Sequence, residues 1–185
     1  MRVLQSAVVI FLFFAGIVGA QELPPAPAGY EWARCPDIGG ALLVPDGWSF
    51  RRVAAGDGLA YFITKRPWEP PASFETGLTF NVLWDVPGKT GLSPVEYGRR
   101  YVDAAKSTED VVRSWETQLG PFNAFGLVFK GDGEDEGFTF YHLVIGNDRT
   151  GTAFLVLFEA PTSDWEADWK TIEPTVQRML IDDEY

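Results

Sequence analysis

A six-residue apolar run near the end of the chain constrains the fold more than any other feature. Residues 153–158 are Ala-Phe-Leu-Val-Leu-Phe, without a polar side chain at any position. The length suits a β-strand, in which successive side chains point to opposite faces of a sheet. Because both faces of this strand are apolar, both must be covered. The run therefore predicts a sheet with helices on its two sides, or a sheet that closes on itself.

Short strand-like segments fill most of the rest of the chain. Residues 78–85 alternate between apolar and polar side chains, which is the pattern of a strand with one buried face. Linkers at 132–137 and 147–151 join the last three segments as hairpins. The predicted strands span residues 30–34, 41–44, 48–54, 58–65, 78–85, 111–119, 125–130, 138–145 and 153–159.

Two helices are predicted from the residues that begin them. Residues 93–96, Ser-Pro-Val-Glu, combine a capping serine, a proline in the first helical position and a glutamate that closes a capping box. This helix should run to about residue 106. A second capping box at residues 163–166 predicts a C-terminal helix, which Pro174 should kink or restart. The pattern predicts an α+β fold: a mostly antiparallel β-sheet sandwiched by helices in an α/β/α arrangement.

The first 20 residues have the composition of a cleaved signal peptide. Arg2 supplies a positive charge, residues 7–20 are apolar, and small residues precede Gln21. The apolar run is shorter than the roughly 20 residues of a transmembrane helix, although an uncleaved anchor is the alternative. We expect an exported protein, periplasmic or extracellular, with no transmembrane span after cleavage. Residues 21–29 then form a Pro/Ala-rich tether and residues 30–185 a single domain.

Charge and residue counts exclude several classes of function. The chain has 26 acidic residues against 15 basic ones, a net charge of −11, whereas a nucleic-acid partner needs clustered Lys and Arg. A single Cys excludes an internal disulfide, and a single His excludes a multi-histidine metal centre. No nucleophile elbow, P-loop or dinucleotide-binding glycine motif occurs. We therefore expect no catalytic residue, no cofactor and no enzyme activity.

One acidic loop is a candidate cation site. Residues 131–137 place four carboxylates between glycines, and hard cations such as Ca²⁺ prefer oxygen ligands on flexible loops. The EF-hand pattern fails, because the twelfth position of the loop is Leu143 rather than Glu. The alternative is an acidic hairpin tip that keeps a sheet edge soluble. The candidate metal ligands are Asp132, Glu134, Asp135 and Glu136.

Trp68 is the candidate partner-binding residue. It lies between Pro67 and the pair Pro70-Pro71, and a Trp on a proline-stiffened loop has little conformational entropy to lose on binding. The alternative is a Trp folded back over its own sheet.

Cys35 and His142 are the remaining residues with reactive side chains. His142 shares a strand face with Phe140 and Val144, which is typical of a core or subsurface histidine. Cys35 could be a buried small hydrophobe, an intermolecular partner or a reactive thiol. A Cys35–His142 dyad is also conceivable, although neither residue lies in a recognisable nucleophile context.

The order of the predicted elements resembles a known family. A short strand leads into Val-Pro-Asp-Gly-Trp at residues 44–48, and a strand hairpin follows. A further strand, the helix at residues 93–96, four strands and a closing helix complete the layout. Residues 38–181 are similar in this order to the PsbP-like group, which includes the photosystem II extrinsic subunit, the Ran-binding Mog protein and exported bacterial DcrB-type proteins. The resemblance implies the PsbP-like fold and a non-catalytic accessory, docking or chaperone-like role. It carries no binding residue to this chain.

Three non-catalytic functional hypotheses follow, and a hydrolase built on Cys35 or His142 is a fourth. The favoured one is an exported non-catalytic accessory or interaction protein whose partner is another protein. The second is an acidic inhibitor or immunity-type protein for a basic extracytoplasmic enzyme, since acidic surface speeds encounter with a cationic partner. The third is a small-ligand-binding module with an aromatic pocket, which the chain's 7 Trp could help to line.

Overall fold

The computed structural model describes residues 22–55, 58–70, 72–132 and 135–185. The predicted signal peptide, residues 1–20, lies outside the described residues. Residues 22–27 of the predicted tether contain no helix or strand, and most of them are exposed. None of the described helices is long and apolar enough to span a membrane.

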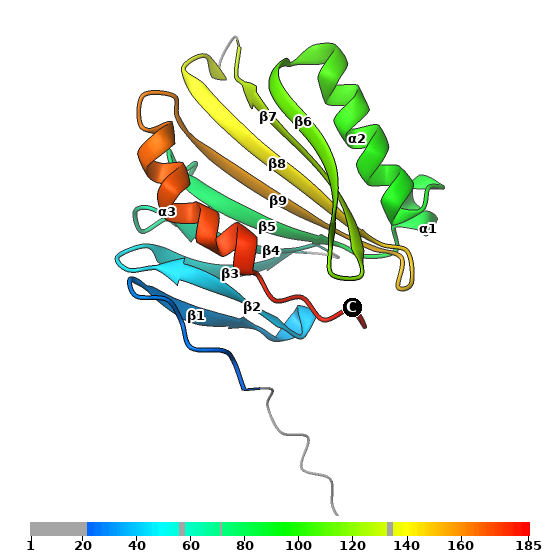
Figure 1. Cartoon of the computed structure of the whole chain (residues 1–185), viewed down its shortest axis with the longest axis horizontal. Coiled ribbons are helices and arrows are strands. Elements are labelled where there is room, and N and C mark those ends of the chain that lie inside the picture. Colours follow the sequence, from blue (N-terminus) through cyan, green and yellow to red (C-terminus); the bar gives the residue numbers. More distant parts are fainter. Residues whose placement is uncertain (1–21, 56–57, 71, 133–134) are drawn as a thin grey trace, which may run out of the picture.

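A seven-stranded antiparallel sheet forms the body of the molecule, in the order β3-β4-β5-β9-β8-β7-β6 (Figure 1). Two further strands pair as a separate hairpin, and three helices pack around the sheet. The hairpin is β1 (Tyr30–Cys35) with β2 (Gly40–Pro45), joined by a 3-10 turn at Pro36–Ile38. The main sheet contains β3 (Ser49–Ala55), β4 (Gly58–Thr64), β5 (Gly77–Leu83), β6 (Asp110–Leu119), β7 (Phe122–Lys130), β8 (Phe138–Asn147) and β9 (Thr152–Pro161). The helices are α1 (Val86–Thr90), α2 (Pro94–Thr108) and α3 (Trp165–Arg178). The predicted α+β fold with a mostly antiparallel sheet is confirmed.

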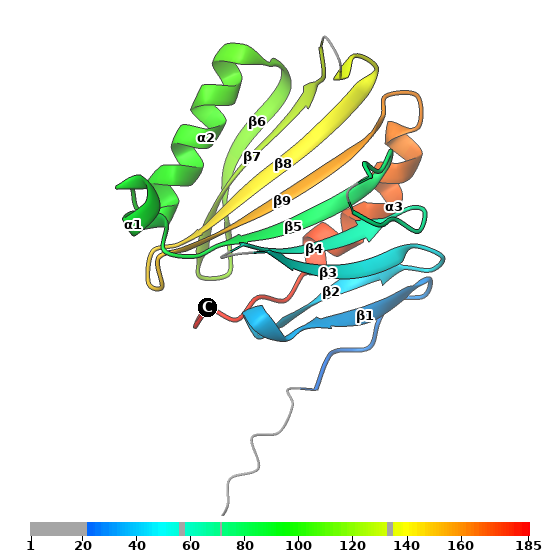
Figure 2. The same cartoon turned by 180° about the vertical axis from the view of Figure 1, so that it is seen from behind.

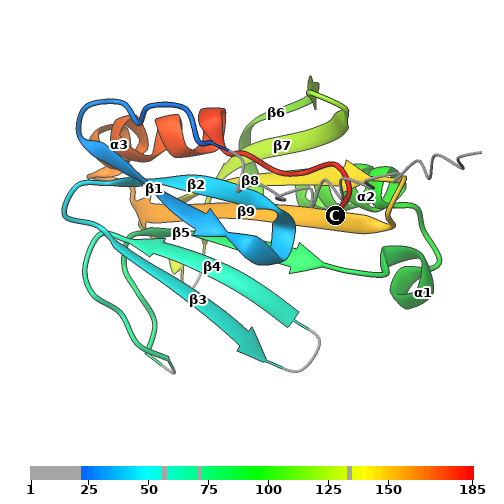
Figure 3. The ribbon, with the colours of Figure 1, turned by 90° about the horizontal axis from the view of Figure 1, so that it is seen from below.

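One face of the sheet, which we call the hairpin face, carries the main hydrophobic core. Phe154, Val156 and Phe158 of β9 point into it and are fully buried, and Ile172 of α3 closes over them. The β1–β2 hairpin lies beside α3 on the same side of the sheet (Figure 3). The two together cover the apolar stripe that alternation along each strand creates.

The opposite face, which we call the helix face, packs against α2. Phe125 and Leu127 of β7 and Val102 of α2 form a second apolar cluster there. A Cβ atom added at Gly98 would lie 2.7 Å from the Phe125 ring, so the glycine lets the helix approach the sheet closely. Helices thus lie on both sides of the sheet, which is the first of the two arrangements that residues 153–158 predict.

The chain after α3 returns along the hairpin as an extended tail. Leu180 and Ala41 exchange backbone hydrogen bonds of 2.9 and 3.0 Å. A Cβ atom at Gly40 would lie 2.0 Å from the Leu180 carbonyl oxygen, so only glycine permits this approach. The Tyr185 carbonyl then accepts hydrogen bonds from Asn147 and Thr150 at the β8–β9 turn. The tail therefore ties the hairpin to the main sheet.

Helix α1 was not expected, because no element was predicted between the strand at residues 78–85 and the helix that begins at residue 93. Asp85 adopts a left-handed conformation with φ +52°, and its carboxylate accepts a hydrogen bond from the Gly88 backbone N–H. An Asp cap followed by Pro87 near the first helical position is a recognised start signal. The strand pattern at residues 78–85 obscured this signal.

The predicted start of the C-terminal helix is wrong by one residue. Asp164, not Ser163, occupies the N-cap, and it makes no side-chain capping hydrogen bond. The helix also continues through Pro174 to Arg178 instead of restarting. The proline removes the hydrogen bond to the carbonyl of Lys170, but Lys170 is exposed, so water can satisfy that carbonyl.

Candidate functional site

The helix face is covered by helix over only part of its width. Helix α2 packs on β6, β7 and β8 and reaches β9. Among the described residues, no helix lies over β3, β4 or β5 on this side (Figure 2). A hollow of about 350 Å³ lies here. We call it the open groove; its side chains include Val53, Phe62, Asn81, Leu83, Tyr97 and Leu155.

The open groove is apolar and uncharged. Its floor comes from alternating positions of β4, β5 and β9, which point to the same face. The floor of the groove includes one amide residue, Asn81, whose Nδ2 donates a 3.4 Å hydrogen bond to the Leu155 carbonyl. Among the described residues that line the groove there is no Asp, Glu, His, Lys or Arg. Such a surface suits contact with an apolar partner.

A second cavity of about 300 Å³ lies farther along β5 and β9 on the same face. We call it the aromatic–acidic pocket. Its aromatic and imidazole rings come from the β4–β5 loop, β7 and β8: Phe74, Phe129, Phe140 and His142. Its carboxylates come from the end of α2, the β7–β8 hairpin and β9: Glu109, Asp132, Asp135 and Glu159. No Lys or Arg occurs among the described residues that line it.

The rings on the strand side of the pocket form one packed cluster. Phe129 stacks on Phe140 with centroids 5.0 Å apart, and His142 meets Phe129 edge-on at 4.9 Å. These side chains share a face because β7 and β8 pair with Phe129 opposite Phe140. Phe74 reaches the pocket from the loop on the other side. A cavity lined by aromatic rings is therefore present on the helix face, but none of the described residues that line it is a Trp.

His142 is a neutral, largely buried histidine. Its Nδ1 and the Tyr101 hydroxyl of α2 share a hydrogen bond of 2.8 Å. Burial lowers the pKa of His142 to about 4, because desolvation disfavours the imidazolium. Burial likewise raises the pKa of Tyr101 to about 12. The pair therefore anchors α2 to β8 and leaves no charged imidazole at neutral pH.

Glu159 is the perturbed carboxyl of the pocket. It lies on β9 opposite Phe140 of β8, in a half-buried position. Burial raises its pKa to about 7, and the nearby Asp135 carboxylate adds to the effect. No ion pair joins Glu159 to a Lys or Arg within the described part of the chain. Sequence reasoning missed Glu159, although it is the first charge after the apolar run at residues 153–158.

Trp68 lies folded over β4, which is the alternative placement considered for it. Its ring packs on Phe62 at 4.5 Å and meets Phe74 edge-on at 5.7 Å. Its indole N–H donates to the Ala72 carbonyl, and Arg51 donates to the Trp68 carbonyl. Trp68 is half-buried. It contacts Phe62, which lines the open groove, and Phe74, which lines the aromatic–acidic pocket. Its role in partner binding stays a prediction.

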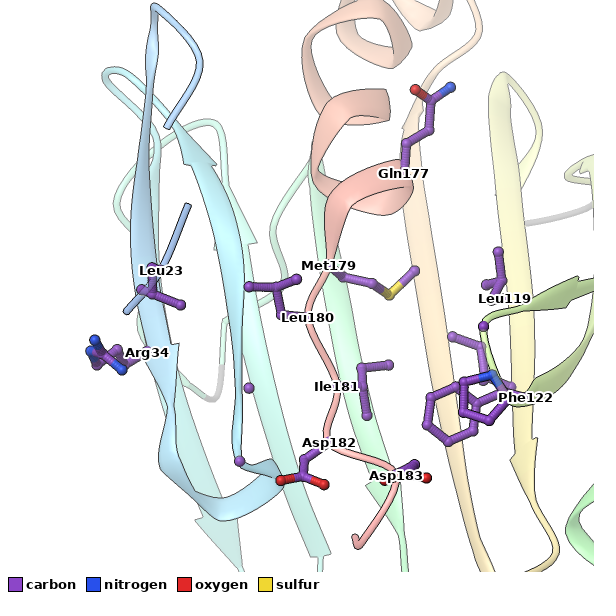
Figure 4. A pocket seen from close by; sticks show the side chains of 15 residues that line it. Leu23, Arg34, Leu119, Phe122, Gln177, Met179, Leu180, Ile181, Asp182 and Asp183 are labelled. Carbon is purple, nitrogen blue, oxygen red and sulfur yellow. The ribbon is translucent and has the colours of Figure 1, made fainter. Parts of the chain in front are cut away.

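A larger cavity of about 640 Å³ surrounds the C-terminal tail (Figure 4). Met179 and Ile181 point toward Leu119 and Phe122, while Leu180 points toward the β1–β2 hairpin. Its carboxylates are engaged by the tail itself and by the β8–β9 turn. Asp182 accepts a hydrogen bond from the Glu184 backbone N–H, and Asp183 pairs with Arg149 at 3.1 Å. Phe122 is the sole aromatic residue among those that line it, so this cavity does not match the predicted aromatic pocket.

Cys35 and His142 do not form a dyad. Cys35 is fully buried in the core of the hairpin face, where its Sγ lies 3.8 Å from the Ala33 carbonyl oxygen. His142 lies on the helix face, and its Nδ1 is bonded to Tyr101. Burial raises the pKa of the Cys35 thiol to about 12, so the thiolate is disfavoured. The buried-hydrophobe alternative accounts for this residue.

The acidic loop contributes to the pocket without showing a metal cluster. The Asp135 backbone N–H donates to the Asp132 carbonyl at 2.9 Å, which closes the hairpin turn. Glu134 lies outside the described residues. No group of three or more potential metal ligands occurs in the described ranges. The predicted cation site at Asp132, Glu134, Asp135 and Glu136 stays a prediction.

Comparisons with known proteins confirm the fold-level resemblance. The chain matches the solution structure of cyanobacterial PsbP (CyanoP) from Synechocystis sp. PCC 6803 with a TM-score of 0.56 and 12% identity, covering 89% of this chain and 100% of that one. The chain has the PsbP-like fold. It also matches the Ran-binding protein Mog1p of Saccharomyces cerevisiae with a TM-score of 0.51 and 10% identity, covering 82% of this chain and 95% of that one. No family model and no curated protein matches the sequence. Identities this low establish the fold alone.

Proposed function

We propose that the protein is an exported, non-catalytic accessory protein that binds another protein through the open groove. The observation that carries this proposal is the apolar half of the helix face that no helix covers. A sheet face of this kind is ordinarily buried against a second layer. A partner protein would supply that missing layer.

The surroundings of the groove support a binding role. Phe62 and Tyr97 present aromatic side chains at its two sides, and Trp68 packs directly on Phe62. Aromatic residues in apolar hollows carry much of the binding energy in protein interfaces. Mog1p, a structural neighbour, is itself a binding protein, in its case for Ran.

A matched pair of substitutions tests the groove. Val53 lies on the edge strand β3 and lines the groove, whereas Val112 lies on the opposite edge strand β6 and is 58% exposed. The tagged chain is expressed in its native host, reversibly cross-linked and recovered from the envelope fraction. We expect Val53→Glu to abolish capture of the partner, because a carboxylate would be desolvated in the interface. Val112→Glu should capture it as the wild type does.

Two results would contradict the proposal. Loss of the partner with Val112→Glu but not with Val53→Glu would place the interface at the other edge of the sheet. Equal capture by all three proteins would show that the groove takes no part in binding.

Export is tested separately. The N-terminus of the mature protein, recovered from the envelope and sequenced, should be Gln21.

A further inference from the structure

The aromatic–acidic pocket has walls whose chemistry selects for positive charge. The rings of Phe74 and Phe140, which are polarizable and carry electron-rich faces, line the cavity together with four carboxylate residues. An anion would meet only repulsion here. A neutral apolar ligand would desolvate the carboxylates without replacing their interactions with water. A cation with an apolar part gains from both kinds of wall.

The end of helix α2 adds to the negative potential. Glu109 is the C-cap residue of α2 and lines the pocket, so the carbonyl end of the helix lies beside the cavity. This end carries a partial negative charge. Lys106, the basic residue of the last turn, is paired with Asp103 at 3.3 Å and is not among the lining residues. Lys106 therefore does not neutralise the negative charge that Glu109 and the end of α2 place beside the cavity.

Glu159 is the strongest sign that a counter-charge is missing. Its carboxyl lies in the cavity lining, and the charge that acts on it there is the repulsive carboxylate of Asp135. Water can reach the Glu159 oxygens, because no fully buried side-chain oxygen among the described residues lacks a hydrogen-bond partner. Among the described residues no side-chain hydrogen bond or ion pair occupies Glu159. A bound cation would provide the partner.

The size of the cavity limits the ligand. A volume of about 300 Å³ is at the lower end of the range for small-molecule sites. A compact cation or a single side chain fits such a space, whereas a folded segment does not. The carboxylates alone would also admit a metal ion, but no three potential ligands lie close enough together in the described residues to hold one, whereas the aromatic rings match the alkyl groups of an organic cation.

We propose that the aromatic–acidic pocket binds an alkylammonium group, with the charge at the carboxylates of Glu159 and Asp135 and the alkyl part against the rings of Phe74 and Phe140. The group is carried by a free organic amine or by a lysine side chain of a protein. This site is separate from the open groove and does not depend on the function proposed for it.

Isothermal titration calorimetry of the full mature chain tests the chemistry with choline and its neutral isostere 3,3-dimethyl-1-butanol. We expect choline to bind and the isostere to bind at least about tenfold more weakly, because only choline carries the charge. Glu159→Gln should weaken choline binding about tenfold and Phe140→Leu about fivefold. The matched control Glu31→Gln changes an exposed residue of β1 and should leave choline binding unchanged.

A proton count makes the test specific for Glu159. The other titratable residues that line the pocket with Glu159 are Glu109, Asp132, Asp135 and His142. Choline should displace a proton from the wild type near pH 7, because its charge favours the ionised carboxyl. The heat of binding will then depend on the ionisation enthalpy of the buffer, and this dependence should vanish in Glu159→Gln.

A second arm distinguishes the two sources of the ammonium group. A short capped peptide with one lysine is compared with the same peptide carrying norleucine. Tighter binding of the lysine peptide than of choline assigns the site to a protein side chain, and the reverse order assigns it to a free amine.

Three results would overturn the proposal: binding of neither cation, equal binding of choline and its isostere, or choline binding that Glu159→Gln leaves unchanged while the variant remains folded.

Discussion

Two buried groups on the helix face should give the stability of the protein opposite dependences on pH. Glu159 has a folded-state pKa of about 7, raised from 4.5, so between these values the folded protein holds a proton that the unfolded chain has lost. Its contribution to stability therefore falls as pH rises from 4.5 through 7. His142 has a folded-state pKa of about 4, lowered from 6.5, so the unfolded chain binds the extra proton. Its contribution falls as pH decreases from 6.5 toward 4.

The magnitudes follow from the pKa differences. For the largely buried His142, the change from 6.5 to about 4 makes the protein about 2 kcal/mol less stable at pH 4.5 than at pH 7. The Glu159 change is of similar size, but this group is more exposed, and solvent screening reduces its effect to about 1 kcal/mol in the opposite direction. The wild type should therefore lose only about 1 kcal/mol between pH 7 and pH 4.5.

Two conservative substitutions separate the contributions. Glu159→Gln removes the carboxyl, so the variant should lose about 2 kcal/mol from pH 7 to pH 4.5. His142→Asn keeps a polar atom near Tyr101 but removes the imidazole, so the variant should gain about 1 kcal/mol over the same range. Loss of ring packing shifts the whole His142→Asn curve without changing its slope. The measurement is urea unfolding followed by tryptophan fluorescence at pH 4.5, 5.5, 6.5 and 7.5.

The sign of each slope decides the outcome. Parallel curves for the wild type and Glu159→Gln would show that this carboxyl titrates at its ordinary pKa and is solvated in the folded protein. A wild-type stability that rises steeply toward pH 4.5 would show that His142 is not kept neutral by burial. Either result would refute the electrostatic description of the pocket.

Three further substitutions test the packing and capping of helices α2 and α3. Gly98→Ala should destabilise the protein by about 1–3 kcal/mol in urea unfolding despite the better helix propensity of Ala, because its Cβ would crowd Phe125; a gain in stability would mean that α2 lies farther from the sheet. Thr175→Val removes the 2.8 Å hydrogen bond from a buried hydroxyl to the Leu43 carbonyl and should lower the free energy of unfolding by about 1–3 kcal/mol, whereas an unchanged midpoint would indicate that water replaces it. Ser93→Ala removes the N-cap of α2 and should cost about 1 kcal/mol, an effect that Ser93→Asp should rescue.

The sheet could be predicted from the sequence because its signals are local. Residues 153–158 fall within β9, and their apolar character on both faces predicted cover on two sides. Alternation at residues 78–85 predicted β5, which spans Gly77–Leu83, but placed its start one residue late and its end two residues too far along the chain. The strand that begins at Phe122 was predicted three residues too short, because Asn123 and Ala124 carry no strand signal of their own.

The pockets could not be predicted, because they depend on which strands become neighbours. Glu159 and Phe140 face each other only because β9 pairs with β8 in that register. Phe74 joins them from a loop more than sixty residues away in the sequence. The position of Trp68 likewise depends on Phe62, which the alternation of β4 places on the helix face. Local patterns indicated these residue types but not their association.

The central claim is that the uncovered half of the helix face is the working surface of the protein. The most direct test is site-specific photo-cross-linking in the native host, with a photoreactive residue at position 53 on β3 or at position 112 on β6. We expect a discrete adduct with one partner protein from position 53 and none from position 112. Adducts from position 112 alone, or the same adducts from both, would contradict the claim.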